Sequence, residues 1–229
     1  MPGLGTIINC AAIILGGLCG MLFGRFVKKQ LQDALTCVCG ISVIVIGLSG
    51  ALEGISNKEL LVIGCLSVGT LLGELCRIEQ GFEKFGEWLK KKTGNARDNA
   101  FVEAFVTASL TVCIGAMAIV GSIADGISGD WSILATKAVL DLVIILVMTC
   151  SLGKGCIFSA IPVALLQGGV TALARLIRPL MTEAALANIS LVGSILILCV
   201  GINLVFGKKV RVANMLPSLI LAAAAAFIF

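Results

Sequence analysis

The sequence contains no histidine, and only 13% of its 229 residues are charged. Without histidine the usual proton relay near neutral pH is missing, so any proton transfer would have to use carboxylates. The ten cysteines lie almost entirely within apolar runs, as small packing residues do, and Cys37 and Cys39 project to different helix faces. We therefore expect no metal site, no cofactor and no disulfide framework.

The sequence also lacks the signals of two further classes of function. It has no glycine-rich phosphate loop and no nucleophile with a neighbouring base, so we do not expect an enzyme. Its basic residues occur in a few clusters without interleaved aromatic side chains, so we expect no nucleic-acid partner. The net charge of +4 bears on membrane topology instead.

The sequence is rich in apolar residues: 59% of the chain is hydrophobic and the mean hydropathy is +1.10. A soluble domain is about 45–50% apolar and about 25% charged. A chain this apolar cannot bury all of its apolar surface in a soluble core, so the lipid bilayer must cover that surface. Apolar runs of about twenty residues fit membrane-spanning helices, whereas barrel strands alternate over about ten. The sequence predicts an all-α polytopic membrane protein, with residues 1–229 as a single transmembrane domain.

We expect about eight transmembrane helices. The first is retained rather than cleaved as a signal peptide, because basic residues follow it and none precedes it. Gly16, Gly20 and Gly24 recur every four residues in it and form one small-residue face for close helix contact. The expected spans are residues 4–26, 31–52, 60–78, 100–124, 132–152, 157–177, 184–206 and 210–229.

Two segments depart from a plain span. Residues 81–94 place Phe82, Phe85 and Trp88 at helical spacing opposite charged residues, which predicts an interfacial amphipathic helix with its apolar face in the headgroup region. In residues 157–177, Pro162 and the later Gln167-Gly168-Gly169 favour a kink or a break. The sequence leaves open whether this segment spans the membrane or is re-entrant.

Ionisable residues within apolar runs are the first candidates for a site. Glu103 lies in the fourth expected span, and Lys137 and Asp141 lie in the fifth. Such residues are costly in lipid, so they usually face protein or water and mark a function. Lys137 and Asp141 are four residues apart and can neutralise each other, so a structural ion pair is an alternative.

Further candidates for transport or ion binding lie near the ends of the expected spans or are uncharged. Glu74 stands near the end of the third span, where it can instead pair with Arg77. Asp125 follows the fourth span in a glycine-rich turn, where it could stand at an entrance. Asn9, Gln167 and Asn203 would supply polar lining, although an amide within a span can also serve as an interhelical hydrogen-bond partner.

Charge distribution predicts the topology. With the N-terminus outside, most of the 17 basic residues fall on the inner side, as the positive-inside rule requires. Those residues are Arg25, Lys28, Lys29, Arg77, Lys84, Lys90, Lys91, Lys92, Arg97, Lys154, Lys208, Lys209 and Arg211.

The chain also carries an internal echo. Leu35-Thr36, Gly40 and Ile44-Val45 recur as Leu110-Thr111, Gly115 and Ile119-Val120. This suggests repeated units of about residues 1–77, 78–152 and 153–229, with the first and third inverted relative to each other. Inverted repeats with a site at their junction are a transporter pattern.

Several motifs together resemble the bacterial YqgA-like/YdfK-like integral membrane family. The resemblance covers essentially the whole chain and implies a multi-pass protein of the bacterial inner (cytoplasmic) membrane. The family has no assigned function beyond a suggested role in transport, so it contributes no site residues. The motifs are residues 5–9 (GTIIN), 73–79 (GELCRIE), 101–130, 137–141, 158–163 with Gln167-Gly168, and 209–214 with Leu216-Pro217.

We expect a transporter or channel for a small solute or ion, with intramembrane carboxylates lining the path. The alternative is a membrane structural or regulatory protein that signals or assembles through the amphipathic segment. The many small-residue faces also allow a homodimer.

Overall fold

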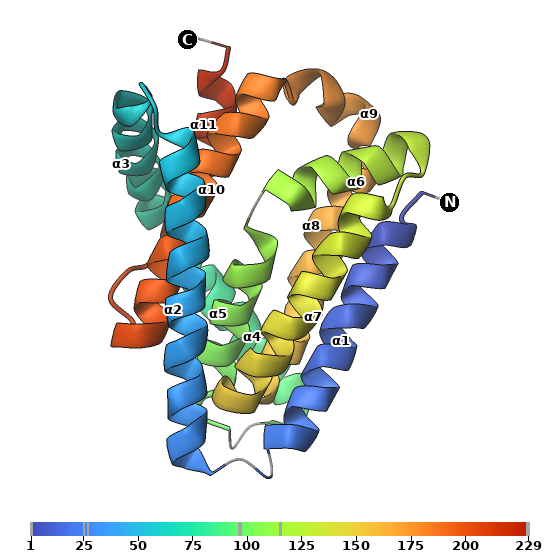
Figure 1. The fold of residues 1–229 in the computed structure, drawn as a ribbon, viewed down its shortest axis with the longest axis vertical. Helices are drawn as coiled ribbons and strands as arrows, with labels where there is room; N and C mark the ends of the chain where they lie inside the picture. Colours follow the sequence, from blue (N-terminus) through green and yellow to red (C-terminus); the bar gives the residue numbers. More distant parts are fainter. Residues whose placement is uncertain (1, 25, 27, 96–97, 115, 228–229) are drawn as a thin grey trace.

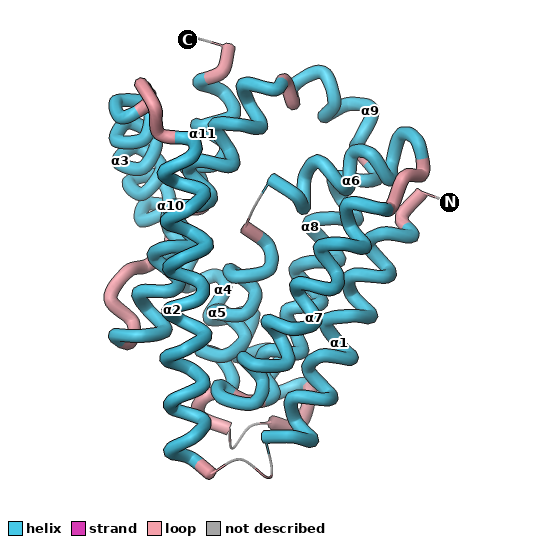
Figure 2. Tube along the Cα trace, viewed as in Figure 1, coloured by secondary structure: helices cyan, strands magenta, loops and turns pink. Residues whose placement is uncertain are grey.

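The computed structural model describes residues 2–24, 26, 28–95, 98–114 and 116–227. Over these residues the chain is a bundle of α-helices with short 3₁₀ segments and no strand (Figures 1 and 2). Arg25, Arg97, Gly115 and the last two residues of the expected eighth span lie outside the described residues. The all-α expectation is confirmed.

The helices follow one another with short connections. Their bounds are α1 Leu4–Gly24, α2 Lys29–Gly54, α3 Glu59–Cys76, α4 Ile78–Lys92, α5 Phe101–Cys113, α6 Ala116–Ser128, α7 Ser132–Leu152, η1 Lys154–Ser159, α8 Ala160–Ala172, α9 Ala174–Ile177, η2 Arg178–Leu180, α10 Glu183–Phe206, η3 Val212–Met215 and α11 Pro217–Ala225.

Glycines set the closest helix contacts. A Cβ at Gly16, Gly20 or Gly24 would meet Leu142, Leu146 or Cys150 respectively, so α1 lies parallel to α7 with the two backbones nearly touching. The small-residue face expected for the first span is therefore a packing face. Close packing of this kind holds helices together in lipid, where the hydrophobic effect does not drive one helix onto another.

Helices of the first and third expected units pack in antiparallel pairs. On α2 and α10, Gly40 approaches Val205 and Gly54 approaches Leu191. On α3 and the α11 region, Gly69 approaches Ser218 and Gly73 approaches Asn214. The α1–α8 pair is also antiparallel. Gly17 approaches Ile157 of η1, just before α8, whereas Cys10, which comes earlier on α1, donates a hydrogen bond to the carbonyl of Ala160, the first residue of α8. Figure 1 shows the pairs α2–α10 and α1–α8 on opposite sides of α5. This arrangement fits inversion of units one and three.

The helices of the second unit do not correspond one to one with the helices of the first unit. The echo of Leu35–Val45 falls at Leu110–Val120, but the first copy lies within the unbroken α2 and the second runs across the junction of α5 and α6.

Within the described residues, six helices are long and apolar enough to cross a membrane, or up to seven if α5 and α6 count as one bent span. The expected number of about eight is therefore approximate. The last expected span is shorter than predicted, because its apolar helical stretch covers only Val212–Ala225, whereas a full crossing needs about 20 residues.

The break in a span lies elsewhere than expected. The sequence favoured a break in residues 157–177, but α8 continues through Gln167, Gly168 and Gly169 to Ala172. Pro162 is the third residue of α8, in the first turn, where a missing N–H removes no helical bond. Instead α5 and α6 meet at a bend of 63°, because the helix ends where Ile114 adopts an extended backbone.

The amphipathic segment is helix α4, and its apolar face packs largely on the protein. Leu89 is buried with Phe101 and Phe105, and Phe85 meets Phe105 edge to face. Trp88 remains half exposed, stacked on Phe85 with the Lys92 ammonium over its ring. Most of the surface expected to lie among headgroups therefore contacts α5, and Trp88 is left for the interface.

The contact between α1 and α7 leads to a stability prediction. A Cβ at Gly20 would stand 2.5 Å from the Leu146 carbonyl oxygen, whereas a Cβ at Gly64 on α3 meets nothing within 4 Å. Gly20→Val should destabilise the protein by about 1–3 kcal/mol or more through overpacking. Thermal unfolding in detergent should show a lower midpoint for Gly20→Val and little change for the matched Gly64→Val. Equal midpoints would contradict the close packing of α1 on α7.

Candidate functional site

A buried ion pair lies at the middle of α7. The Lys137 ammonium stands 2.7 Å from Asp141 Oδ2, and both side chains are less than a tenth exposed. Asn9 of α1, also buried, donates a hydrogen bond of 3.0 Å from Nδ2 to the same carboxylate. Asn9 Oδ1 has no partner within the described residues. The expected pairing of Lys137 with Asp141 is present, and Asn9 joins it as a third polar group; we call these three residues the central triad.

The central triad lies beside the bend between α5 and α6. Cys113, the last residue of α5, is close enough to Lys137 and Asp141 to interact with their charges, and Cys10 is also in range. Cys10 in turn donates a weak hydrogen bond to the Ala160 carbonyl at the start of α8. The charge pair of α7 is thus contacted by α1 and lies within electrostatic range of the end of α5, and α8 is joined to this group through Cys10 of α1.

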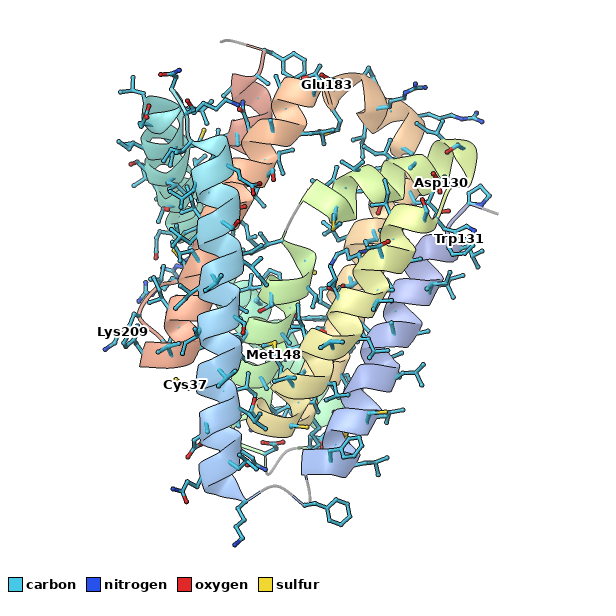
Figure 3. All side chains as sticks on the ribbon, viewed as in Figure 1. Cys37, Asp130, Trp131, Met148, Glu183 and Lys209 are labelled. Carbon is cyan, nitrogen blue, oxygen red and sulfur yellow. The ribbon has the colours of Figure 1, made fainter. Side chains whose placement is uncertain are left out.

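A pocket lies at the end of the bundle where α1 begins. Its volume is about 560 Å³, and it lies between α1, α6 and α8. In Figure 3 the labelled Asp130 and Trp131 mark the same end, next to the start of α7. We call it the α1–α8 pocket; it is lined by Pro2, Gly3, Thr6, Gly126, Gly168, Thr171, Ala172 and Arg175.

A second pocket lies at the opposite end of the bundle. Its volume is about 450 Å³, and it lies between α4, α5 and the end of α10. Leu152, the last residue of α7, lines it, whereas Leu134 near the start of α7 contacts Gly5 next to the first pocket. We call it the α5–α10 pocket; its polar lining is Thr36, Glu79, Glu83, Asn99, Glu103, Thr107, Asn203 and Lys208.

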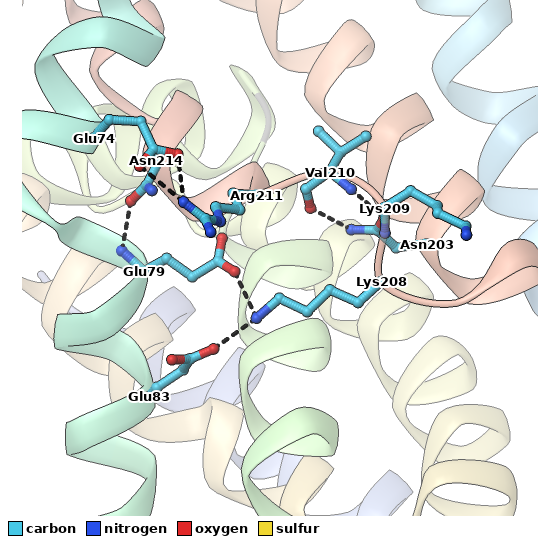
Figure 4. A network of polar contacts seen from close by, with 9 residues as sticks. All are labelled: Glu74, Glu79, Glu83, Asn203, Lys208, Lys209, Val210, Arg211 and Asn214. Carbon is cyan, nitrogen blue, oxygen red and sulfur yellow. Dashed lines mark hydrogen bonds and ion pairs between the residues drawn. The ribbon is translucent and has the colours of Figure 1, made fainter.

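Lys208 bridges two of the acids at this pocket (Figure 4). Its ammonium stands 2.7 Å from Glu79 and 2.6 Å from Glu83. Burial alone would lower the pKa of Lys208, but its hydrogen bonds and charge interactions with Glu79 and Glu83 outweigh burial and raise the pKa. Lys208 therefore stays charged throughout the usual lysine range, and it loses its charge, and with it both ion pairs, only as the pH rises above that range.

The structure separates the expected site residues. Glu103 lies in the first turn of α5, exposed and lining the α5–α10 pocket, far from the central triad. Glu74 is exposed and pairs at 3.1 Å with Arg211, not with its neighbour Arg77. Arg77 adopts a left-handed backbone that ends α3, which breaks the helical spacing assumed for a pair with Glu74.

Two further candidates hold the backbone in place. Asn203 accepts the backbone N–H groups of Lys209 and Val210 and donates to the Val210 carbonyl, so it clamps the loop after α10 (Figure 4). Asp125 lies within α6 rather than in a turn. Its buried carboxylate accepts the N–H groups of Gly3 and Gly5, where it caps the positive end of α1.

Gln167 keeps the character of a lining residue. It is 1% exposed, and neither its amide nitrogen nor its amide oxygen has a partner within the described part of the chain. Two threonines that the sequence reasoning missed share this feature, Thr6 and Thr171. Their spacing could have revealed them, since Thr6 lies three residues before Asn9 and Thr171 four residues after Gln167, one helical turn each.

Comparison with known proteins identifies relatives along nearly the whole chain. A family model described as "Protein of unknown function (DUF554)" matches residues 4–227. The chain is 30% identical over 223 residues to "Uncharacterized protein YqgA" of Escherichia coli (strain K12), which covers 96% of this chain and 94% of the relative. It is 28% identical over 226 residues to "Uncharacterized membrane protein YdfK" of Bacillus subtilis (strain 168), at 98% and 96% coverage. No solved structure matches the chain significantly. The resemblance noted from the sequence motifs is confirmed.

The buried pair predicts strong coupling between Lys137 and Asp141. Removal of one partner leaves an uncompensated buried charge, which costs about 3–5 kcal/mol. Asp141→Asn and Lys137→Gln should each lower the unfolding midpoint in detergent, and the double variant should recover much of the loss because no lone charge remains. Additive losses in this double-mutant cycle would contradict a direct interaction.

Proposed function

Because the chain belongs to the family described as Protein of unknown function (DUF554), which carries no assigned activity, its function has to be inferred from its own residues, and we propose that it is a membrane transporter or channel for a small solute or ion. The observation that carries the proposal is the central triad, a charged and hydrogen-bonded group held at mid-depth in a membrane protein. Ionisable residues there are costly in lipid and are kept where they serve a pathway.

The position of the central triad supports a pathway. Asp141 stands nine residues after Ser132 and eleven before Leu152, so the rise of an α-helix places it about 15 Å from each end of α7. A polar pocket lies toward each of those ends. Two openings that flank a buried polar centre are the arrangement that alternating exposure to the two sides of a membrane requires.

The bend between α5 and α6 supports the same function. Transporters expose backbone groups at interrupted helices, and such groups are tolerated at membrane depth only where protein or water covers them. Here the interruption lies next to Lys137 and Asp141. The antiparallel pairing of units one and three adds a second feature of the inverted-repeat transporter pattern.

The arrangement of α4 weakens the regulatory alternative. That alternative needs a free amphipathic face for a partner protein, but Phe85 and Leu89 are packed against Phe101 and Phe105 of α5. What remains is a single half-exposed tryptophan with a lysine over its ring, an arrangement suited to the membrane interface.

A flux assay tests the proposed function. Purified protein in proteoliposomes should carry at least one member of a panel of monovalent and divalent cations, anions, protons and small neutral solutes. Asp141→Asn alone could fail by misfolding, so the Lys137→Gln/Asp141→Asn double variant should be compared with it. Both should lose flux, because the charged centre is gone even where the fold survives.

The matched control is Asp130→Asn, which removes a solvent-exposed acid at the turn before α7. It should leave flux unchanged. Flux that persists in the double variant, or no flux for any solute in the wild-type protein, would contradict the proposal.

The proposed location is the bacterial inner membrane with the N-terminus outside. The helix pairing puts the α1–α2, α4–α5, α7–η1 and α10–η3 connections at one end of the bundle, and these carry most of the basic clusters. The positive-inside rule then places that end in the cytoplasm. A reporter that is active only in the cytoplasm should be active when inserted after Lys92 and inactive when fused at the N-terminus. The reverse pattern would overturn this orientation.

A further inference from the structure

Buried polar atoms without partners gather on one side of the molecule. Within the described residues, most such side-chain atoms belong to α1, α6 and α8, and few lie elsewhere. Native proteins leave few buried polar groups without a hydrogen-bond partner, because each such group costs free energy of folding unless a water molecule or a ligand bonds to it. The atoms concerned are Thr6 Oγ1, Asn9 Oδ1, Asp125 Oδ1, Gln167 Nε2 and Oε1, and Thr171 Oγ1.

These atoms lie along the stretches of α1 and α8 that run from the α1–α8 pocket toward the depth of the central triad. Thr6 and Thr171 both line the pocket, and the Thr6 side chain is buried with its hydroxyl unpaired. Gln167 lies one helical turn deeper on the same face of α8 as Thr171. Because Cys10 contacts Ala160 and Thr6 shares the pocket with Thr171, the antiparallel register places Gln167 between the levels of Thr6 and Cys10 on α1. Asn9, at that depth, holds Asp141.

The charges around the α1–α8 pocket cancel. Arg175 is the cation at its exposed rim, and Asp125, next to the lining residue Gly126, is an anion already bound by two backbone N–H groups. Below them, Lys137 and Asp141 neutralise each other. An ion that enters such a lining loses its hydration without meeting net opposite charge, which is unfavourable in a low dielectric. A neutral solute has no such penalty.

We propose that the α1–α8 pocket and Gln167 form the binding site for a small uncharged solute that both donates and accepts hydrogen bonds, a class represented by glycerol and urea. The proposal rests on the proposed transport function and assigns its substrate class. Two threonine hydroxyls can each donate or accept, and the Gln167 amide offers both a donor and an acceptor. Together they match a polyol or an amide. Each hydrogen bond to such a solute would give a partner to a buried polar atom that has none within the described residues.

Gly168 and Gly169 provide a matched test. A Cβ at either position meets nothing within 4 Å, so both positions accept the first carbon of a side chain without a clash, yet Gly168 lines the pocket and Gly169 does not. Neither requires a positive φ, and replacing glycine within α8 favours the helix. Gly168→Leu should therefore fill the pocket, and Gly169→Leu should leave it open.

The experiment measures reswelling of proteoliposomes by stopped-flow light scattering after a pulse of glycerol, urea or erythritol. The wild-type protein and Gly169→Leu should reswell faster than protein-free vesicles with at least one solute. Gly168→Leu should abolish this gain, and Gln167→Leu should slow it about tenfold, the loss expected from one or more hydrogen bonds.

Gln167→Leu also separates a binding role from a structural one. If the Gln167 amide has no hydrogen-bond partner until a solute binds, its replacement by an apolar side chain of similar size should raise the unfolding midpoint in detergent while transport falls. A lower midpoint would indicate that fixed water molecules hold the amide in place, and would overturn its assignment as a binding residue.

The remaining outcomes distinguish this proposal from the transport function itself. Ion flux that depends on Asp141, together with no reswelling by any of the three solutes, would leave the transport function standing and overturn the substrate class. Equal reswelling by Gly168→Leu and Gly169→Leu would overturn the site. If neither ions nor solutes cross, both proposals fail.

Discussion

The structure depends on the need to keep charge out of contact with lipid. Lys137 and Asp141 neutralise each other in the middle of α7, and Asn9 of α1 reaches the same carboxylate. The hydrogen bond from Asn9 fixes α1 against α7, and the glycine face of α1 lets the two backbones approach closely enough for it to form. Close packing and charge burial therefore depend on each other. Without the close approach at Gly16 and Gly20, Asp141 would lose its hydrogen bond from Asn9, and lipid offers no donor to replace it.

The antiparallel pairs on either side of this centre explain the overall arrangement. α2 with α10 and α3 with α11 form one group, and α1 with α8 belongs to the other, joined by α7. α5 lies between these groups, whereas α6 packs mainly on α7 and α8, and the last residue of α5, next to the bend, is within electrostatic range of the charge pair. The two pockets differ in polarity. Glu79, Glu83 and Glu103 outnumber Lys208 in the lining of the α5–α10 pocket. The α1–α8 pocket is lined by the hydroxyls of Thr6 and Thr171, with Arg175 at its rim.

The sequence predicted those features that follow from local pattern. Apolar run length identified helices, the spacing of Gly16, Gly20 and Gly24 identified a packing face, and the spacing of Lys137 and Asp141 identified their pair. Features that depend on distant contacts could not be read in this way. The glycine-rich surroundings of Asp125 predict a turn, yet Asp125 caps the start of α1 from within α6. Glu74 was matched with the nearest cation in sequence, but the end of α3 turns it toward Arg211. Pro162 and Gln167-Gly168-Gly169 predict a kink or a break, but Pro162 lies in the first turn of α8, where it removes no helical hydrogen bond, and α8 continues through both glycines.

Water and solute that reach the buried pair must also reach the native cysteine next to it, and this access can be measured. Cys113 lies beside Lys137 and Asp141, Cys76 is exposed at the end of α3, and Cys156 is fully buried in the core. The measurement is the rate at which a small water-soluble thiol reagent modifies each cysteine in membrane vesicles, followed by mass spectrometry. Cys113 should react more slowly than Cys76 but clearly faster than Cys156, and Gly168→Leu should slow the reaction of Cys113 when the reagent enters from the side of the α1–α8 pocket. Modification of Cys113 no faster than that of Cys156 from either side would contradict the existence of a path to the central triad.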